Sequence, residues 1–167
     1  MNIHPIFVHF PVAFFTFYAL AELARIQLLT RQPYWFYIKA SLVILGCLGG
    51  VAAIVTGQMA EDIMRGSPAL EKHEMFAFLT FGVFGFLALC YAAAWLRREV
   101  LKNPAMTDSS ISVVGSWAEK IVAGWPAVVL ALLGLALVTI TGSLGGSMVY
   151  GPATDPVVKI IYQIFVR

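Results

Sequence analysis

Histidines are the residues of this chain whose type and spacing point most directly to chemistry. His9 and His73 each open the same pattern, H-x-x-x-A-F-[FL]-T-F, in residues 9–17 and 73–81. Each pattern leads into a long apolar run. Neutral imidazoles bind haem iron and transition metals, and ionisable residues in apolar segments are candidates for function. The duplicated pattern therefore predicts a two-fold site with two matched imidazoles.

Small side chains follow both of these histidines on the same helical face. Positions four and seven after a helical residue share its face, and here they hold one alanine and one threonine in each copy: Ala13 and Thr16, then Ala77 and Thr80. A flat cofactor needs such clearance beside its ligands. Small-residue stripes are also ordinary packing surfaces between membrane helices, so a packing surface is the alternative interpretation.

The composition indicates how such a site would be positioned. Hydrophobic residues make up 60% of the 167 residues and charged residues 12%, far from the average of soluble proteins. Four stretches, near residues 5–29, 34–60, 73–96 and 121–146, reach the length of about 20 residues that a bilayer requires. Glu22 falls in the last turns of the first stretch, where a long side chain can reach the membrane surface. The net charge of +2 gives no indication of nucleic-acid binding.

The fold class predicted from these stretches is all-α: an integral membrane four-helix bundle in one domain, residues 1–167. The halves repeat, since Thr-Gly closes the second and fourth stretches at residues 56–57 and 141–142. Two duplicated helical hairpins would place the first and third spans diagonally across the bundle. His9 and His73 would then face each other at equal depth.

Helix signals add detail at the C-terminal half. Ser116 with Glu119 reads as a capping box that opens the fourth span, after a cytoplasmic loop over residues 102–116. Asp155 is expected to cap a short helix over residues 156–167. A single polar stripe on that helix predicts an interfacial position, and packing against a partner subunit is the equal alternative.

Basic residues predict the orientation. The two connections within the hairpins hold or flank Arg25, Arg31, Lys39, Arg97, Arg98, Lys102 and Lys120, whereas the opposite side has Arg65, Lys72, Lys159 and Arg167. Positive loops stay in the cytoplasm. The chain is thus expected to be a multi-pass protein of the bacterial inner membrane, with both termini in the periplasm.

Two imidazoles across an apolar slot suit haem b better than other metals. Zinc or copper would usually require further Cys, His or carboxylate ligands. His9 and His73 are therefore predicted to be the axial ligands of one haem iron. His4, five residues before His9, would point away from it and contact the cofactor from outside the iron. Arg65 could pair with a haem propionate, and a solvated charge in the loop is the alternative interpretation.

The opening residues 4–11, HPIFVHFP, together with His73 and residues 145–151, GGSMVYG, resemble a family of small bacterial four-helix membrane proteins, a domain of unknown function. The resemblance covers residues 3–151. Members tend to carry a further histidine after the Val-Tyr pair, where this chain has Pro152 and Ala153. The resemblance implies the fold and an association with redox proteins, since relatives occur beside or fused to cytochrome c-type modules.

The predicted function is that of a membrane b-type cytochrome near the periplasmic face. It would pass electrons between a quinone or membrane partner and a periplasmic redox protein such as cytochrome c, as a subunit of a larger complex in membrane lipid. No catalytic constellation appears, so an enzyme in its own right is not expected. The alternatives are a cofactor-free structural or assembly subunit, and a metal-handling protein that uses His4, His9 and His73.

Overall fold

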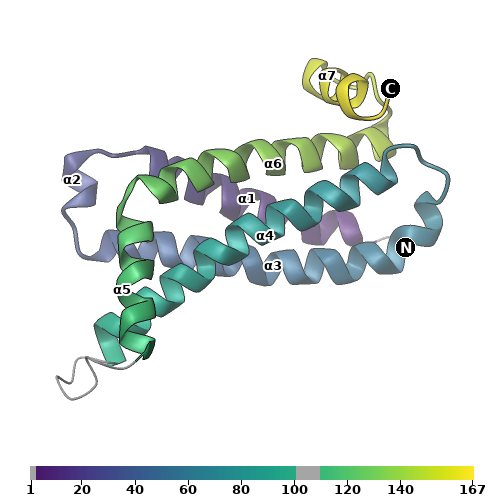
Figure 1. Ribbon diagram of the computed structural model, residues 1–167. Coiled ribbons are helices and arrows are strands. Elements are labelled where there is room, and N and C mark those ends of the chain that lie inside the picture. The colour runs from purple at the N-terminus through teal and green to yellow at the C-terminus, as the bar shows by residue number, and fades with distance from the viewer. Residues whose placement is uncertain (1–2, 101–109) are drawn as a thin grey trace.

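The computed structural model describes residues 3–100 and 110–167, and these residues form helices and connecting turns without any β-strand. Four of these helices are long, and they make up most of the molecule (Figure 1). The elements are α1 (His4–Leu23), α2 (Gln27–Thr30), α3 (Tyr34–Met64), α4 (Leu70–Trp95), the π-helical turn η1 (Leu96–Val100), α5 (Ser110–Ala123), α6 (Trp125–Tyr150) and α7 (Pro156–Phe165).

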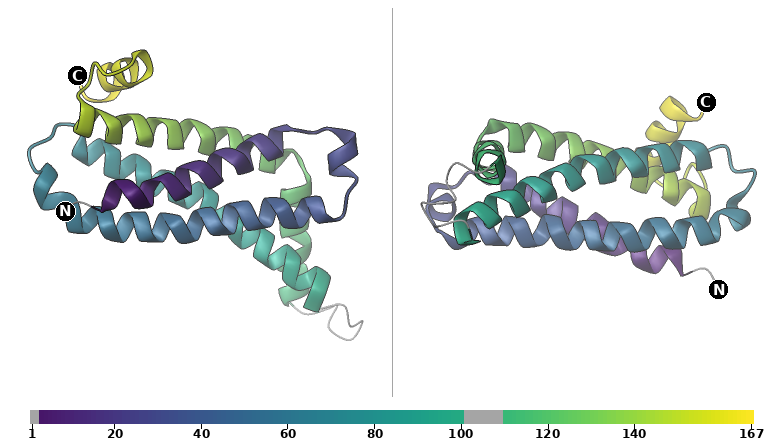
Figure 2. Two further views of the ribbon diagram at one scale, coloured as in Figure 1. Left: turned by 180° about the vertical axis from the view of Figure 1, so that it is seen from behind. Right: turned by 60° about the horizontal axis from the view of Figure 1, so that its bottom comes forward.

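The four long helices form an up-and-down bundle (Figure 2). Helix α1 packs against α3 and α6, and α4 packs against the same two helices. Helices α1 and α4 therefore lie diagonally across the bundle, as the sequence predicts. All four are long and apolar enough to cross a membrane. The predicted fold class, an all-α four-helix membrane bundle with a short C-terminal helix, is confirmed.

Aromatic side chains join the two diagonal helices at the centre. The Phe15 and Phe84 rings stack with centroids 4.0 Å apart and planes 6° from parallel. Tyr18 meets the edges of Phe84 and Tyr91. All four side chains are at most 2% exposed, so this stack closes the middle of the bundle.

Large apolar side chains cover the outside of the bundle. Exposed fractions reach 60% at Phe17, 64% at Leu48, 75% at Met59 and 72% at Leu89. Without a lipid phase, so much exposed apolar area would be costly. The outer surface is therefore the surface that contacts membrane lipid.

Two helix boundaries differ from the prediction. The first span ends at Leu23 rather than near residue 29, and the separate short helix α2 follows. Before α6, the backbone at Gly124 is extended (ψ −173°), so that α5 and α6 are distinct helices.

The predicted capping box at Ser116 does not form. Ser116 lies inside α5, where its hydroxyl donates to the Val113 carbonyl. Glu119 instead pairs with Arg97 and Arg98. Residues 102–109 of the predicted loop lie outside the described residues.

Helix α7 begins as predicted. The Asp155 carboxylate accepts hydrogen bonds from the backbone N–H groups of Val157 and Val158 at 2.8 and 3.0 Å. The helix packs against the end of the bundle, with the Phe165 ring 4.8 Å from that of Phe76. Ile160 and Ile164 on its outer side are 55% and 66% exposed. One side thus binds the chain's own bundle, and the other is available to lipid.

Candidate functional site

His4 opens α1 and lies against α3. Its Nδ1 is 3.2 Å from the Thr56 Oγ1. The ring covers Gly57 so closely that a methyl group at Gly57 would lie 3.2 Å from His4 Cε1. Glycine at this position therefore leaves room for the imidazole against α3.

His73 lies in the first turn of α4 and packs against a glycine of α6, as His4 packs against a glycine of α3. Its Nδ1 is 3.0 Å from the Thr141 carbonyl oxygen. A methyl group at Gly145 would lie 3.0 Å from His73 Cε1. The His4 and His73 imidazoles lie in the same part of the bundle. The structure therefore brings together one imidazole from each half of the chain.

The spacing of these contacts defines the structural repeat. His4 and Phe15 precede His73 and Phe84 by 69 positions each. On the partner helices, Gly46 and Gly57 precede Gly134 and Gly145 by 88 positions each. Gly46 faces Phe15 and Gly134 faces Phe84, so closely that a methyl carbon added at either glycine would lie 2.5 Å from the ring. His4, not His9, is thus the equivalent of His73.

The predicted pair of His9 and His73 does not form. His9 is exposed, and its Nδ1 bonds to the Pro5 carbonyl of its own helix. Ala13 is exposed as well. The sequence pattern matched residues five positions out of structural register, and five residues turn an α-helix by about 140°. The stripe that begins at His9 therefore faces away from the side of the bundle occupied by His4.

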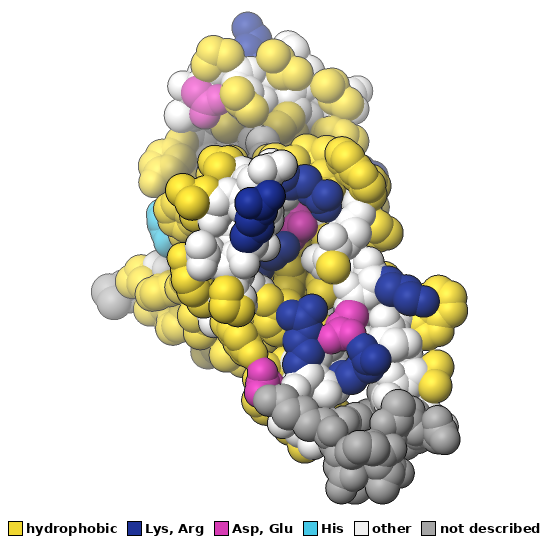
Figure 3. Space-filling model, turned by 90° about the vertical axis from the view of Figure 1, so that its left-hand side faces the viewer, with side chains coloured by type: hydrophobic (Ala, Val, Ile, Leu, Met, Phe, Trp, Pro, Cys, Tyr) yellow, Lys and Arg dark blue, Asp and Glu magenta, His cyan; other side chains and the backbone are white. Residues whose placement is uncertain are grey.

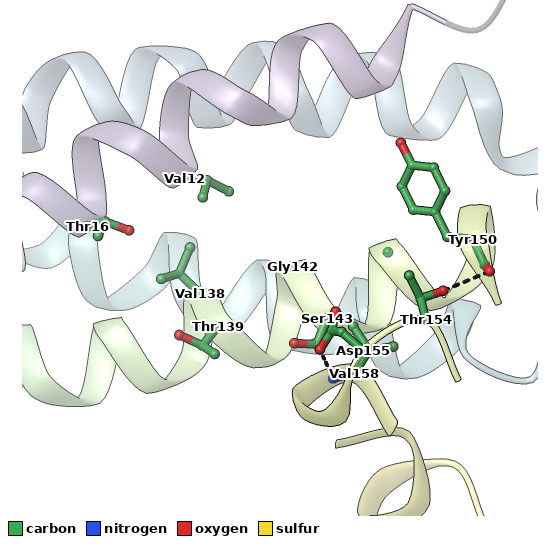
Figure 4. A pocket seen from close by; sticks show the side chains of 11 residues that line it. Val12, Thr16, Val138, Thr139, Gly142, Ser143, Tyr150, Thr154, Asp155 and Val158 are labelled. Atoms are coloured by element: carbon green, nitrogen blue, oxygen red, sulfur yellow. Dashed lines mark hydrogen bonds between the residues drawn. The ribbon is translucent and has the colours of Figure 1, made fainter. Parts of the chain in front are cut away.

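The remaining predicted residues are divided between different surroundings. Thr16 lines a groove of about 380 Å³ between α1, α6 and the start of α7, with Val138 across from it (Figure 4). Thr80 is buried on α4, with its hydroxyl 3.1 Å from that of Thr141. Ala77 is half-buried.

Arg65 lies outside the cluster of the two imidazoles. It is exposed at the C-terminal end of α3. Of the predicted site residues, His4, His73 and Thr80 therefore belong to one region, and His9, Ala13, Thr16 and Arg65 do not line it.

Hydrogen bonds fix the protons of both imidazoles. A carbonyl oxygen only accepts, so His73 must donate from Nδ1 to Thr141. The Thr56 hydroxyl donates its proton to the Ala52 carbonyl at 2.8 Å, so it accepts from His4 Nδ1. Each neutral ring then carries its lone pair on Nε2. Histidines that bind metals almost always donate their second ring nitrogen in this way.

The donor set restricts which metal these residues suit. Within residues 3–100 and 110–167, no group of three or more His, Cys, Asp or Glu side chains is placed to hold a metal ion. Haem iron requires only two protein ligands, because the porphyrin supplies four nitrogens. Two neutral imidazoles in an apolar bundle fit that requirement.

A second residue spacing in the sequence pairs His4 with His73, whereas the H-x-x-x-A-F pattern pairs His9 with His73. Histidine and phenylalanine are separated by ten residues in both His4–Phe15 and His73–Phe84. The facing glycines, Gly46 with Gly57 and Gly134 with Gly145, show the same separation. Each helix contains only one such pair of residues. The structure is needed to show that the pairs in the two halves are equivalent.

A second polar cluster lies at the other end of the bundle, and the sequence pattern did not predict it. Glu22, whose side chain was expected to reach the membrane surface, is 3% exposed and lies among the helices. Its Oε2 lies 2.8 Å from the Lys39 Nζ and 3.3 Å from the Tyr91 hydroxyl. A buried carboxylate is tolerated only when it is paired and hydrogen-bonded, and these two partners supply both conditions.

The chain matches a known protein family. The model of a family described as "Predicted membrane protein (DUF2231)" matches residues 1–154. No curated protein and no solved structure matches the chain.

Proposed function

The chain belongs to this family of predicted membrane proteins, DUF2231. On the geometry of its two imidazoles, we propose that it is a b-type cytochrome subunit, with His4 and His73 as the two axial ligands of one haem. The observation that carries the proposal is the equivalence of these two imidazoles. They occupy matching positions in two halves of a membrane bundle, each lies against a glycine of the neighbouring helix, and each donates Nδ1–H to an oxygen. Haem b would supply one-electron chemistry to such a protein.

The chain's own residues would orient the ligands. Thr56 and the Thr141 carbonyl hold the two rings through Nδ1, which increases the basicity of the other ring nitrogen. Gly57 and Gly145 leave room for each ring against the neighbouring helix. The apolar bundle excludes water and favours the neutral form of both imidazoles. His4 would thereby replace His9 as the ligand from the first span.

The proposal includes an orientation and a role. Basic residues gather at the end of the bundle that holds α2, η1 and α5, and this end would lie in the cytoplasm. The two imidazoles at the opposite end would then lie near the periplasmic face of the inner membrane. Electrons would pass between a quinone or membrane partner and a periplasmic redox protein such as a cytochrome c. The chain would be a carrier subunit and not a catalyst in its own right.

The absorption spectrum of the protein purified in mild detergent tests this proposal. We expect a reducible low-spin b-type spectrum. His4→Ala and His73→Ala should each abolish it or convert it to high spin, because one axial position opens. His9→Ala is the matched control: it removes an exposed imidazole from the same helix, and the spectrum should not change.

Two results would contradict the proposal in different ways. Loss of the spectrum in His9→Ala but not in His4→Ala would restore the pair that the sequence pattern predicts. A colourless wild-type protein, purified with its native partners, would remove haem altogether. It would favour a structural subunit, for which the closed aromatic stack of Phe15 and Phe84 is the supporting observation.

A further inference from the structure

A pocket of about 540 Å³ opens at the end of the bundle remote from the two imidazoles. Figure 3 shows this end, where Lys and Arg side chains surround a hollow with an acidic side chain inside it. Helices α1, α2, α3, η1 and α5 all contribute to the walls. The residues used below are Glu22, Arg25, Arg31, Phe36, Lys39 and Arg98.

The charges on the pocket walls do not balance. Four of its lining side chains are cationic and one, Glu22, is anionic. Glu22 is already matched by Lys39 at 2.8 Å. Of the three remaining guanidinium groups, only Arg98 has a carboxylate partner within the described ranges, Glu119 at 2.7 Å. Among the described residues Arg31 forms no ion pair. The pocket therefore presents a net positive charge to whatever enters it.

Two of the guanidinium groups are held in place. Arg25 donates to the Gly124 carbonyl at 2.9 Å and lies over the Trp125 ring at 4.7 Å. Arg98 lies over the Phe36 ring at 4.2 Å. Ordering a long side chain in advance reduces the entropy lost when a ligand binds. Planar guanidinium groups match the oxygens of phosphate groups better than an ammonium does.

Membrane topology alone accounts for basic residues at a cytoplasmic end, but not for this arrangement. The positive-inside rule needs Lys and Arg anywhere in short loops. Here they come from separate segments and converge on one pocket around a buried ion pair. Such basic pockets between membrane helices suit the head groups of anionic lipids.

We propose that this pocket binds the phosphate group of an anionic ligand, with Arg25, Arg31 and Arg98 as its contacts. The phosphate could belong to an anionic phospholipid of the adjacent leaflet or to a soluble phosphate compound. This site lies at the opposite end of the bundle from His4 and His73, and it does not depend on the presence of haem.

Native mass spectrometry of the full chain tests the site and separates the two sources. One arm uses nanodiscs that contain equal amounts of phosphatidylglycerol and phosphatidylcholine. We expect preferential retention of phosphatidylglycerol, and a five- to tenfold loss of it in Arg31→Gln, about the value of one charge-assisted contact. The second arm titrates lipid-free protein with inorganic phosphate. Saturable binding there that Arg31→Gln weakens would identify a soluble ligand.

Lys159→Gln is the control, because it removes one positive charge at the other end of the chain. Arg25→Gln is the second test variant, and helical circular dichroism confirms that each variant is folded. The proposal is overturned if Arg31→Gln and Arg25→Gln retain phosphatidylglycerol and bind phosphate as Lys159→Gln does. Equal retention of phosphatidylcholine and phosphatidylglycerol, with no phosphate binding, would also overturn it.

Discussion

Gly46 and Gly134 offer a direct test of the two-fold repeat, because each faces one ring of the central stack. A methyl group at Gly46 would lie 2.5 Å from Phe15 Cε1, and one at Gly134 would lie 2.5 Å from Phe84 Cζ. Carbon atoms in contact are normally about 3.5–4.0 Å apart. Each ring must therefore move by about 1 Å, and the other ring is already stacked on it with centroids 4.0 Å apart.

The expected cost of Gly46→Ala and of Gly134→Ala is about 1–3 kcal/mol each, the usual range for extra volume in a packed core. The control is Gly82→Ala, at a helical glycine with nothing within 4 Å of the added methyl group. Without a clash, Gly→Ala in a helix stabilises by about 0.5–1 kcal/mol. The two test variants should thus fall below wild type and the control at or above it.

The assay is unfolding by sodium dodecyl sulfate in mixed micelles, followed by circular dichroism. The double variant should lose less than the sum of the two single variants, because both displace the same pair of rings. Phe84→Leu in the Gly134→Ala background should recover part of the loss, since leucine vacates the space of the ring. The reasoning is refuted if Gly46→Ala and Gly134→Ala are as stable as Gly82→Ala.

Three further predictions concern other contacts. Lys39→Met should cost about 3 kcal/mol, because it leaves the Glu22 carboxylate buried without its cation; Glu22→Gln in the same chain should recover most of this loss in the same unfolding assay. Phe165→Ala should loosen α7 and speed tryptic cleavage after Lys159, whereas Ile164→Ala, at an exposed position, should leave the cleavage rate unchanged. A reporter fused after Arg167 should be active outside the cytoplasm and one inserted within residues 101–109 inside it; the reverse pattern would contradict the proposed orientation.

Apolar length and composition were sufficient to predict the architecture. A stretch of about 20 apolar residues has few alternatives to a membrane helix, and four such stretches with short connections make an up-and-down bundle. The diagonal placement of α1 and α4 follows from that order. Asp155 also capped its helix as expected, because an N-cap depends only on neighbouring residues.

The register of the repeat was not predictable in the same way. The sequence aligns His9 with His73 because the residues that follow them are nearly identical. The alignment of His4 with His73, which the packing shows, has few identical residues to support it. The alignment of the two halves depends on which ring contacts a glycine of the facing helix. That contact cannot be read from the sequence of α1 alone. His4 was therefore assigned a secondary place, although Gly57 gives its ring the same surface that Gly145 gives His73.

The burial of Glu22 shows the same limit. Its position near a helix end predicts a side chain that reaches the membrane surface, and a single-helix argument gives no reason to expect otherwise. The carboxylate is buried because Lys39 of α3 and Tyr91 of α4 reach it from two other helices. Ion-pair and hydrogen-bond partners on other helices can be identified only when the packing of those helices is known.

Glu22 and Tyr91 are also separated by 69 positions, so they are equivalent positions in the two halves of the chain. They meet across the bundle, the phenol donating to the carboxylate. Two identical two-helix chains could form the stack of Phe15 on Phe84, since a ring can meet its own copy at a symmetry axis. They could not form this phenol–carboxylate bond, because an acid would face an acid, or a phenol a phenol. Joining both halves in one polypeptide is what allows a phenol and a carboxylate to face each other at these equivalent positions.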